Sequence, residues 1–152
     1  IKDENTSLRD EEARDISEAV YKESRQNEVD YRLVLAVMKV ESNFRHKVVS
    51  PRGARGLLQV KPSLARSIAK DMDIQWTGAK SLDEPEKNIQ IGVRFLSLLI
   101  EDFHSLHHAL HAYNMGPTRL KGMLSEKKNV NKGFSNIVMR EYNKNISALP
   151  DP

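Results

Sequence analysis

Residues 31–42 read YRLVLAVMKVES, a near-continuous apolar run that ends on a carboxylate at Glu41. Asp30 precedes the run as a candidate N-cap, and the pattern predicts a deeply buried central helix over Tyr31 to Ser42. The next 29 residues, 42–70, contain no Asp or Glu. A carboxylate carried out of a hydrophobic helix, with no second acid close behind it, suggests a general acid/base whose pKa is raised by desolvation.

The segments outside this run also repeat with helical periodicity, and alternating strand patterns are absent. Two residue pairs resemble capping boxes that start helices, namely Ser7 with Asp10 and Asp83 with Glu86. Besides the central helix, helices are expected over 7–27, from 62 to about 70, from the second capping box to near Phe103, over 106–113, from near 118 onward and over 134–146. The sequence therefore predicts an all-α fold.

Turn-forming residues divide these helices. Gly53 and Gly56, together with Pro51, predict an ordered loop between residues 43 and 60. Residues 71–85 lack clear periodicity and are also expected to form a loop. The two prolines at 150 and 152 are expected to end the ordered part of the chain.

Length and composition fit one globular domain, because 152 residues with 39% hydrophobic content can bury a continuous core. Within residues 1–152 we expect an N-terminal helix at 7–27, a core at 30–120 and a C-terminal helix and tail at 130–152. No apolar stretch approaches the roughly 20 residues that span a bilayer, and the chain opens with Ile1 and charged residues, not with the pattern of a signal peptide, so a soluble, processed or excised piece is expected. The absence of cysteine permits a reducing or an oxidising compartment.

Positive charge is concentrated in one part of the chain. The formal net charge is only +3, yet residues 42–70 carry seven Lys or Arg and no acid, which would suit an anionic polymer. Nucleic acid is not the expected partner, because these residues are scattered, have few aromatic neighbours and belong to no recognised nucleic-acid motif. A solvated basic rim is the favoured interpretation.

Two patterns raise the question of a metal. His104, His107, His108 and His111 have helical spacing, but the group has no Cys and its nearest acids are expected one element back, so a polar helix face is favoured. The segment 71–73, Asp-Met-Asp, lacks the remaining ligands and the glycine of a calcium loop. No metal and no cofactor are therefore expected.

Four ordered motifs carry a family resemblance. They are Glu41-Ser42, residues 50–62 (SPRGARGLLQVKP), Asn88-Ile89 with Gly92, and residues 112–116 (AYNMG). In this order they resemble the motifs of soluble lytic transglycosylases, family 23 glycoside hydrolases related to goose-type lysozyme. The resemblance runs from about residue 30 to 120, and residues 140–145 (REYNKN) are similar to the family's final tyrosine-bearing helix.

The resemblance implies a lysozyme-like single domain with a substrate groove, and roles for seven residues. Glu41 matches the family's acid/base, and the positions that match the groove around the sugar are Ser50, Leu58, Gln59, Tyr113, Asn114 and Tyr142. Two departures affect the expected shape of the subsites: Leu58 replaces the commoner methionine, and Met115 replaces alanine.

The implied reaction is non-hydrolytic cleavage of the β-1,4 bond between N-acetylmuramic acid and N-acetylglucosamine, which leaves a 1,6-anhydro end. A single glutamate would protonate the glycosidic oxygen and then accept the C6 hydroxyl proton, with the substrate's acetamido group assisting. The pKa of Glu41 would then have to rise to about 6, with Arg45, Lys47, Arg52 and Arg55 pointing away from the carboxylate.

Two alternatives stay open. A goose-type hydrolase would need a second carboxylate to position water, for which Asp71, Asp73, Asp83 and Glu84 are the candidates. A catalytically weak peptidoglycan-binding module of an envelope or secretion assembly would keep the groove without turnover. In each case the partner is the peptidoglycan glycan strand, and a periplasmic or cell-envelope location is inferred from where that substrate lies.

Overall fold

The computed structural model describes residues 10–152, which form helices and connecting loops and no strand within that range. The elements are α1 (Asp10–Gln26), α2 (Tyr31–Ser42), α3 (Pro62–Asp71), the 3₁₀ helix η2 (Ala79–Asp83), α4 (Pro85–Phe103), α5 (Leu106–Met115), α6 (Pro117–Ser125) and α7 (Gly133–Ala148). The all-α prediction is confirmed. The predicted capping residue Ser7 lies outside the described residues.

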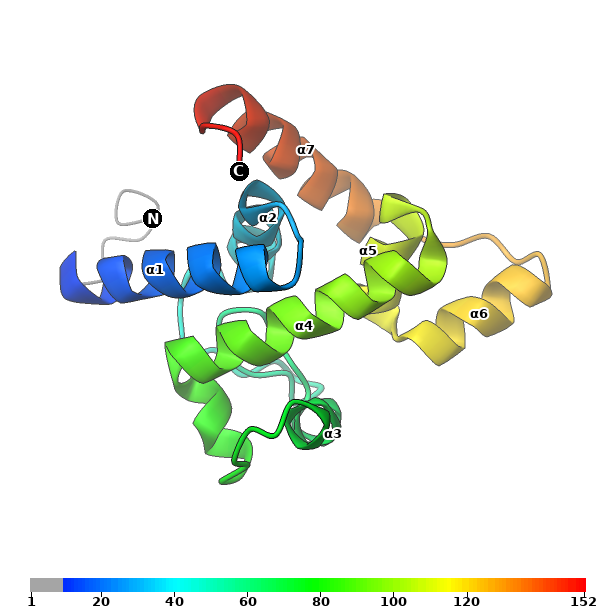
Figure 1. The fold of residues 1–152 in the computed structure, drawn as a ribbon. Helices are drawn as coiled ribbons and strands as arrows, with labels where there is room; N and C mark the ends of the chain where they lie inside the picture. Colours follow the sequence, from blue (N-terminus) through cyan, green and yellow to red (C-terminus); the bar gives the residue numbers. More distant parts are fainter. Residues whose placement is uncertain (1–9) are drawn as a thin grey trace.

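The helix α2 occupies the centre of the fold, between the α1–α4 pair and α7 (Figure 1). Its inward side chains are completely buried, and they include Val34, Val37 and Met38. α4 contacts α1 on one side and continues into α5, against which it also packs. The apolar run at 33–38 thus forms the core of the protein, because its apolar side chains pack against neighbouring helices.

Both ends of α2 are fixed by local geometry. At its start the Asp30 carboxylate accepts a hydrogen bond of 2.9 Å from the backbone N–H of Arg32, which confirms the predicted N-cap. At its end Asn43 and Phe44 both adopt left-handed backbone angles, with φ of 50° and 62°, so the helix stops and the chain reverses. Glu41 therefore lies in the last turn of a rigidly buried helix.

The loop 43–61 is held against α4 by the completely buried Asn88. The Asn88 side-chain amide donates 2.9 Å hydrogen bonds to the carbonyls of Arg55 and Leu82, and its carbonyl oxygen accepts one of 2.8 Å from the Leu58 N–H. Gly56 lies against this amide with φ of 78°, and a Cβ there would collide with it. The glycine and the asparagine together set the path of the loop.

The predicted capping box of Asp83 with Glu86 is wrong. Helix α4 starts after Glu84, with Pro85 in its first turn and no side-chain cap. Asp83 instead accepts hydrogen bonds of 2.9 and 3.2 Å from the Arg55 guanidinium. It sits at the end of η2, which forms part of the segment 71–85 that was predicted to be entirely loop. The ion pair with a residue 28 positions away outweighs the local cap, because it satisfies both carboxylate oxygens.

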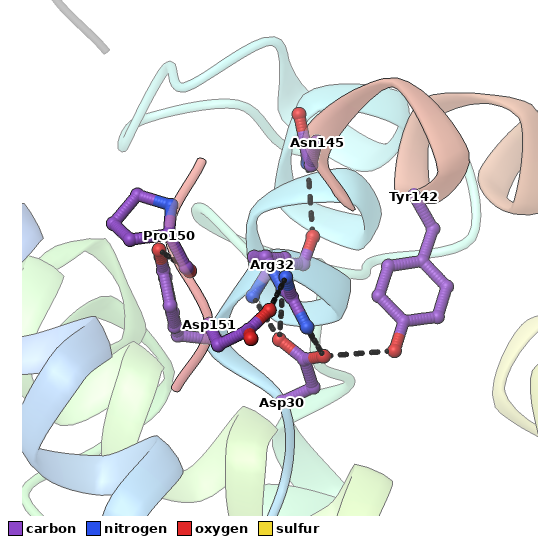
Figure 2. A network of polar contacts seen from close by, with 7 residues as sticks. Asp30, Arg32, Tyr142, Asn145, Pro150 and Asp151 are labelled. Atoms are coloured by element: carbon purple, nitrogen blue, oxygen red, sulfur yellow. Dashed lines mark hydrogen bonds and ion pairs between the residues drawn. The ribbon is translucent and has the colours of Figure 1, made fainter. Parts of the chain in front are cut away.

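The C-terminal tail is the second correction, because the chain does not lose its order at Pro150 (Figure 2). The Pro150 carbonyl accepts a 2.6 Å hydrogen bond from the Tyr31 hydroxyl, and Asp151 forms a 3.0 Å ion pair with Arg32. Asn145 of α7 donates a further hydrogen bond to the Arg32 carbonyl. The prolines end the helix, but the tail remains attached to the start of α2.

Candidate active site

A cavity of about 520 Å³ opens at the C-terminal end of α2, with Glu41 in its wall. Five of the seven residues predicted for the site line it: Glu41, Ser50, Gln59, Tyr113 and Asn114. They come from α2, the loop 43–61 and the end of α5, segments separated by up to 73 positions in sequence. The fold therefore brings most of the predicted site residues around one cavity.

Glu41 has the environment expected of a general acid. Its side chain is partly buried, and the apolar lining of the cavity includes Val60, Leu64, Phe95 and Met115. Burial raises the pKa of Glu41 from 4.5 to about 7. Among residues 10–152 no basic side chain forms an ion pair or hydrogen bond with it. The carboxyl is therefore half protonated near neutral pH and can both give and take a proton.

Gln59 and Ser50 are partly committed to holding the loop in shape. Gln59 has a left-handed φ of 50°, and its side-chain amide donates 3.0 Å hydrogen bonds to the carbonyls of Val48 and Gly56. The Ser50 hydroxyl accepts a 3.1 Å hydrogen bond from the Ala54 N–H across the turn. Both side chains are fixed by these contacts, so they present their remaining polar groups to the cavity in one orientation.

Tyr113 is buried against the loop 43–61, while Asn114 is exposed at the cavity edge. The Tyr113 hydroxyl donates a 2.5 Å hydrogen bond to the Leu58 carbonyl, and its ring lies 5.2 Å from that of Phe95. Burial raises the pKa of Tyr113 well above 10, and the nearby Glu41 charge adds to the rise. The phenol thus stays neutral and acts as a hydrogen-bond donor at physiological pH.

The other two predicted residues are not brought into the cavity wall. Leu58 is 1% exposed, and its side chain packs against the position of Gly92 in α4. The Tyr142 hydroxyl donates a 2.9 Å hydrogen bond to Asp30 at the opposite end of α2 (Figure 2). Because a helix rises 1.5 Å per residue, Asp30 and Glu41 are separated by roughly 16 Å. Tyr142 therefore contacts the helix that carries Glu41, but not the cavity beside it.

The basic residues divide into two groups. Arg45 donates to the Ser42 carbonyl at 3.0 Å and Arg55 pairs with Asp83, so neither lines the cavity. Arg52 and Lys61 do line it. From the sequence, both were expected in a general basic rim, with Arg52 pointing away from the carboxylate. Their place in the cavity wall could not be read from the charge pattern, because seven cations share that segment.

Two further lining residues were missed altogether, Arg119 in α6 and Asn131 in the segment before α7. α6 extends to one side of the fold, and the chain then returns toward α5 and α7 (Figure 1). No local sequence signal marks either residue. Their place beside Glu41 depends on how α6 is oriented after Gly116, which adopts a φ of 99°.

The histidines of α5 face α7 and not the cavity. His107 and His111 each have a ring nitrogen 3.3 Å from the Ser135 hydroxyl. Burial lowers the pKa of His111, and the charges of His108, His107 and Lys132 lower it further. Within the described residues, no group of three or more His, Cys, Asp or Glu side chains could hold a metal ion. In the same range no helix has the length and apolar character needed to cross a bilayer.

The family model described as "Transglycosylase SLT domain" matches residues 18–135, which is more than half of the chain. The chain belongs to this family. The matched range contains α2, the loop 43–61 and the whole α5, and therefore every predicted site residue except Tyr142. The resemblance stated from the four motifs is confirmed at the level of the family.

Curated relatives of this SLT domain are named as murein transglycosylases. The soluble lytic murein transglycosylase of Salmonella typhimurium is 35% identical over 103 residues, which cover 66% of this chain and 16% of the relative. The endo-type membrane-bound lytic murein transglycosylase A of Klebsiella pneumoniae is 41% identical over 75 residues, covering 47% of this chain and 36% of that protein. The SLT domain thus spans only about a sixth to a third of these proteins.

Among solved structures, the 70 kDa soluble lytic transglycosylase of Escherichia coli has the same fold. It superposes with a TM-score of 0.78 and 23% identity over 89% of this chain and 24% of that chain. A complex of the 70 kDa enzyme with bulgecin A gives a TM-score of 0.75 at 24% identity. The predicted lysozyme-like fold is therefore confirmed.

Proposed function

We propose that this SLT domain is a peptidoglycan lytic transglycosylase, which cleaves the β-1,4 bond after N-acetylmuramic acid without consuming water. One observation carries the proposal. Among the described residues that line the cavity, Glu41 is the sole carboxylate, and burial holds its pKa near 7. The names of the curated relatives support the same substrate and reaction.

The chemistry would proceed in two proton transfers through the same group. Protonated Glu41 donates to the glycosidic oxygen as the bond to C1 breaks, and the substrate's 2-acetamido oxygen stabilises the positive C1. The Glu41 carboxylate then accepts the proton of the C6 hydroxyl, whose oxygen bonds to C1 and closes the 1,6-anhydro ring. Atoms balance without water, and Glu41 ends protonated for the next cycle.

The goose-type hydrolase is the weaker candidate. It would need a second carboxylate to position water, and none of Asp71, Asp73, Asp83 and Glu84 lines the cavity. Asp83 is already paired with Arg55. Two-carboxylate glycosidases place both groups within about 10 Å across the scissile bond, which this cavity does not provide from those four residues.

The binding-module alternative is disfavoured by the environment of Glu41. A module that only held glycan would gain nothing from a carboxyl that burial makes costly to ionise. We therefore place the domain at the cell envelope, acting on glycan strands. Partners from an envelope or secretion assembly remain a prediction from the sequence.

The test is the mass of soluble products released from purified peptidoglycan by the wild type, Glu41→Gln and the matched control Glu84→Gln, whose side chain is exposed outside the cavity. We expect products one water lighter than hydrolytic fragments, lost about 10² to 10⁴-fold with Glu41→Gln and unchanged with the control. The wild-type rate should also fall above pH 7, as Glu41 ionises. Products of full hydrolytic mass would instead establish a lysozyme, and binding without any products would establish the module.

A further inference from the structure

The charges that line the cavity are unbalanced. Besides Glu41 the wall carries three cations, Arg52, Lys61 and Arg119, which come from the loop 43–61 and from α6. Within residues 10–152 none of the three forms an ion pair with a carboxylate. Other cations in the same range do, such as Arg55 with Asp83 and Lys121 with Asp102. The cavity therefore presents three exposed positive charges that no carboxylate of the described residues neutralises.

These cations do not serve the acid itself. A positive charge within about 6 Å of Glu41 would stabilise the carboxylate and lower its pKa. Burial is the one cause of the Glu41 shift, and it raises the pKa. The three cations line the same cavity without offsetting this rise, so their charge is available to a bound ligand.

The chemistry of the substrate supplies groups for them. In a strand of alternating N-acetylglucosamine and N-acetylmuramic acid the sugar rings are neutral. Negative charge is carried on the lactyl side, either as carboxylates of an attached stem peptide or as the free lactyl carboxylate where the peptide has been removed. Guanidinium and ammonium groups pair with carboxylates in either case.

We propose that Arg52, Lys61 and Arg119 form a carboxylate-recognition rim, which makes the cavity selective for glycan strands with anionic lactyl or stem-peptide groups over neutral glycans. The proposal rests on the function proposed above. When Glu41 is protonated it is neutral, and the three rim residues give the cavity a net positive charge. This charge attracts an anionic strand while Glu41 still holds the proton that it donates. Because the side chains are exposed, the attraction is screened by salt.

The variant Arg52→Gln/Lys61→Gln/Arg119→Gln removes the rim. Its matched control is Lys47→Gln/Arg66→Gln/Lys70→Gln, which removes the same charge from exposed residues outside this cavity. Both are made in the Glu41→Gln background for binding and in the wild-type background for cleavage. The ligands are peptide-bearing glycan strands, the same strands after enzymatic removal of the peptides, and a neutral N-acetylglucosamine oligomer.

We expect the rim variant to bind peptide-bearing strands about tenfold more weakly at low salt, with the difference shrinking as salt rises, while the control binds as before. In the cleavage assay, KM for peptide-bearing strands should rise by the same factor, and kcat should be nearly unchanged. Neutral oligomers should bind both proteins equally. A loss on peptide-bearing strands alone assigns the stem peptide, a loss on stripped strands alone assigns the lactyl carboxylate, and an equal loss on both shows that the rim binds either carboxylate.

Unchanged affinity of the rim variant for both anionic strands would overturn the inference, as would an equal loss in the control. Because affinity is measured without turnover, this failure is distinct from a failure of the proposed activity. The domain could also bind strands through the rim and release no product. That result would support the carboxylate-recognition rim and reject the proposed transglycosylase activity.

Discussion

The two ends of α2 carry two carboxylates in opposite electrostatic states. Burial alone would raise the pKa of Asp30, but hydrogen bonds from the Arg32 side chain, the Arg32 backbone and Tyr142 outweigh it and lower the pKa. Glu41 is also desolvated, yet in the described part of the chain no cation or donor compensates it, and its pKa rises to about 7. The same helix thus has one carboxylate that serves stability and one that is available for chemistry.

Burial and partners together produce the difference, because burial at Glu41 is stronger and is not offset, whereas at Asp30 hydrogen-bond partners outweigh it. Figure 2 shows the Asp30 end, where Arg32 lies between Asp30 and Asp151 and the tyrosine hydroxyl completes the shell. At the other end Arg45 and Arg55 bond elsewhere, and Arg52, Lys61 and Arg119 line the cavity without an ion pair to Glu41 among residues 10–152. A fully partnered carboxylate stabilises the fold, whereas an unpartnered one destabilises it when ionised.

The largest expected effect on stability is at Glu41. Between pH 4.5 and about 7 the folded state holds more protons than the unfolded state, so stability falls as pH rises through this window. At about 1.4 kcal/mol per pH unit the total is about 3 kcal/mol. Glu41→Gln should therefore be more stable than the wild type at pH 8 by up to about 3 kcal/mol and equal to it at pH 4.

Urea unfolding at the two pH values measures this, with Glu84→Gln as the control. A Glu41→Gln variant that is equally or less stable than the wild type at pH 8 would mean that the carboxylate has a partner in solution.

The second effect concerns the opposite end of the helix. Asp30→Ala removes the N-cap and leaves Arg32 without its main partner, so we expect a loss of about 2 kcal/mol at pH 7. Because the Asp30 pKa is lowered, its contribution is present above the unfolded value of 3.8 and is lost as pH falls through the folded value.

The change in stability should thus have the opposite sign from that of Glu41→Gln. Asp30→Ala should be less stable than the wild type, and the difference should be largest near neutral pH. Thermal unfolding from pH 2 to 8 follows it. A constant difference over this range would show that the cap acts through shape alone and not through its charge.

The smallest effects separate the two tyrosines. Tyr142→Phe removes one hydrogen bond to Asp30 and should cost about 1 kcal/mol of stability with cleavage unchanged. Tyr113→Phe leaves the Leu58 carbonyl unpaired, with a similar cost. It should also reduce cleavage, because Leu58 precedes Gln59 in the cavity wall. Chemical denaturation and product release are measured for both; a loss of cleavage in Tyr142→Phe would return this residue to the substrate site.

Local sequence patterns predicted the helices well where residues close in sequence make the interactions that form the helix. Asp30 is an N-cap because its side chain reaches an N–H two residues away, and the apolar run at 33–38 is buried because its side chains pack against neighbouring helices. The same reasoning failed at Asp83, where a local cap competes with a guanidinium brought from 28 residues away.

The candidate site, like the helices, was predicted in part from the sequence. Motif order predicted Glu41, Ser50, Gln59, Tyr113 and Asn114 as site residues, and all five line one cavity, while their roles stay predictions. Tyr142 was placed by a similar local motif, but its hydroxyl reaches Asp30, 112 positions earlier in the chain. Which face of α7 meets which end of α2 depends on packing, and the motif carries no information on it.

By itself, the sequence determined that the protein is helical, that Glu41 ends a buried helix and that no acid follows it within 29 residues. Those properties follow from side-chain periodicity and composition along a continuous segment. Only the tertiary structure decided that Glu41 has no ion-pair partner among residues 10–152, that Arg119 and Asn131 join its cavity, and that Asp30 has three donors. Partners and solvent exposure are set by contacts between distant segments, and the pKa of a carboxyl depends on both.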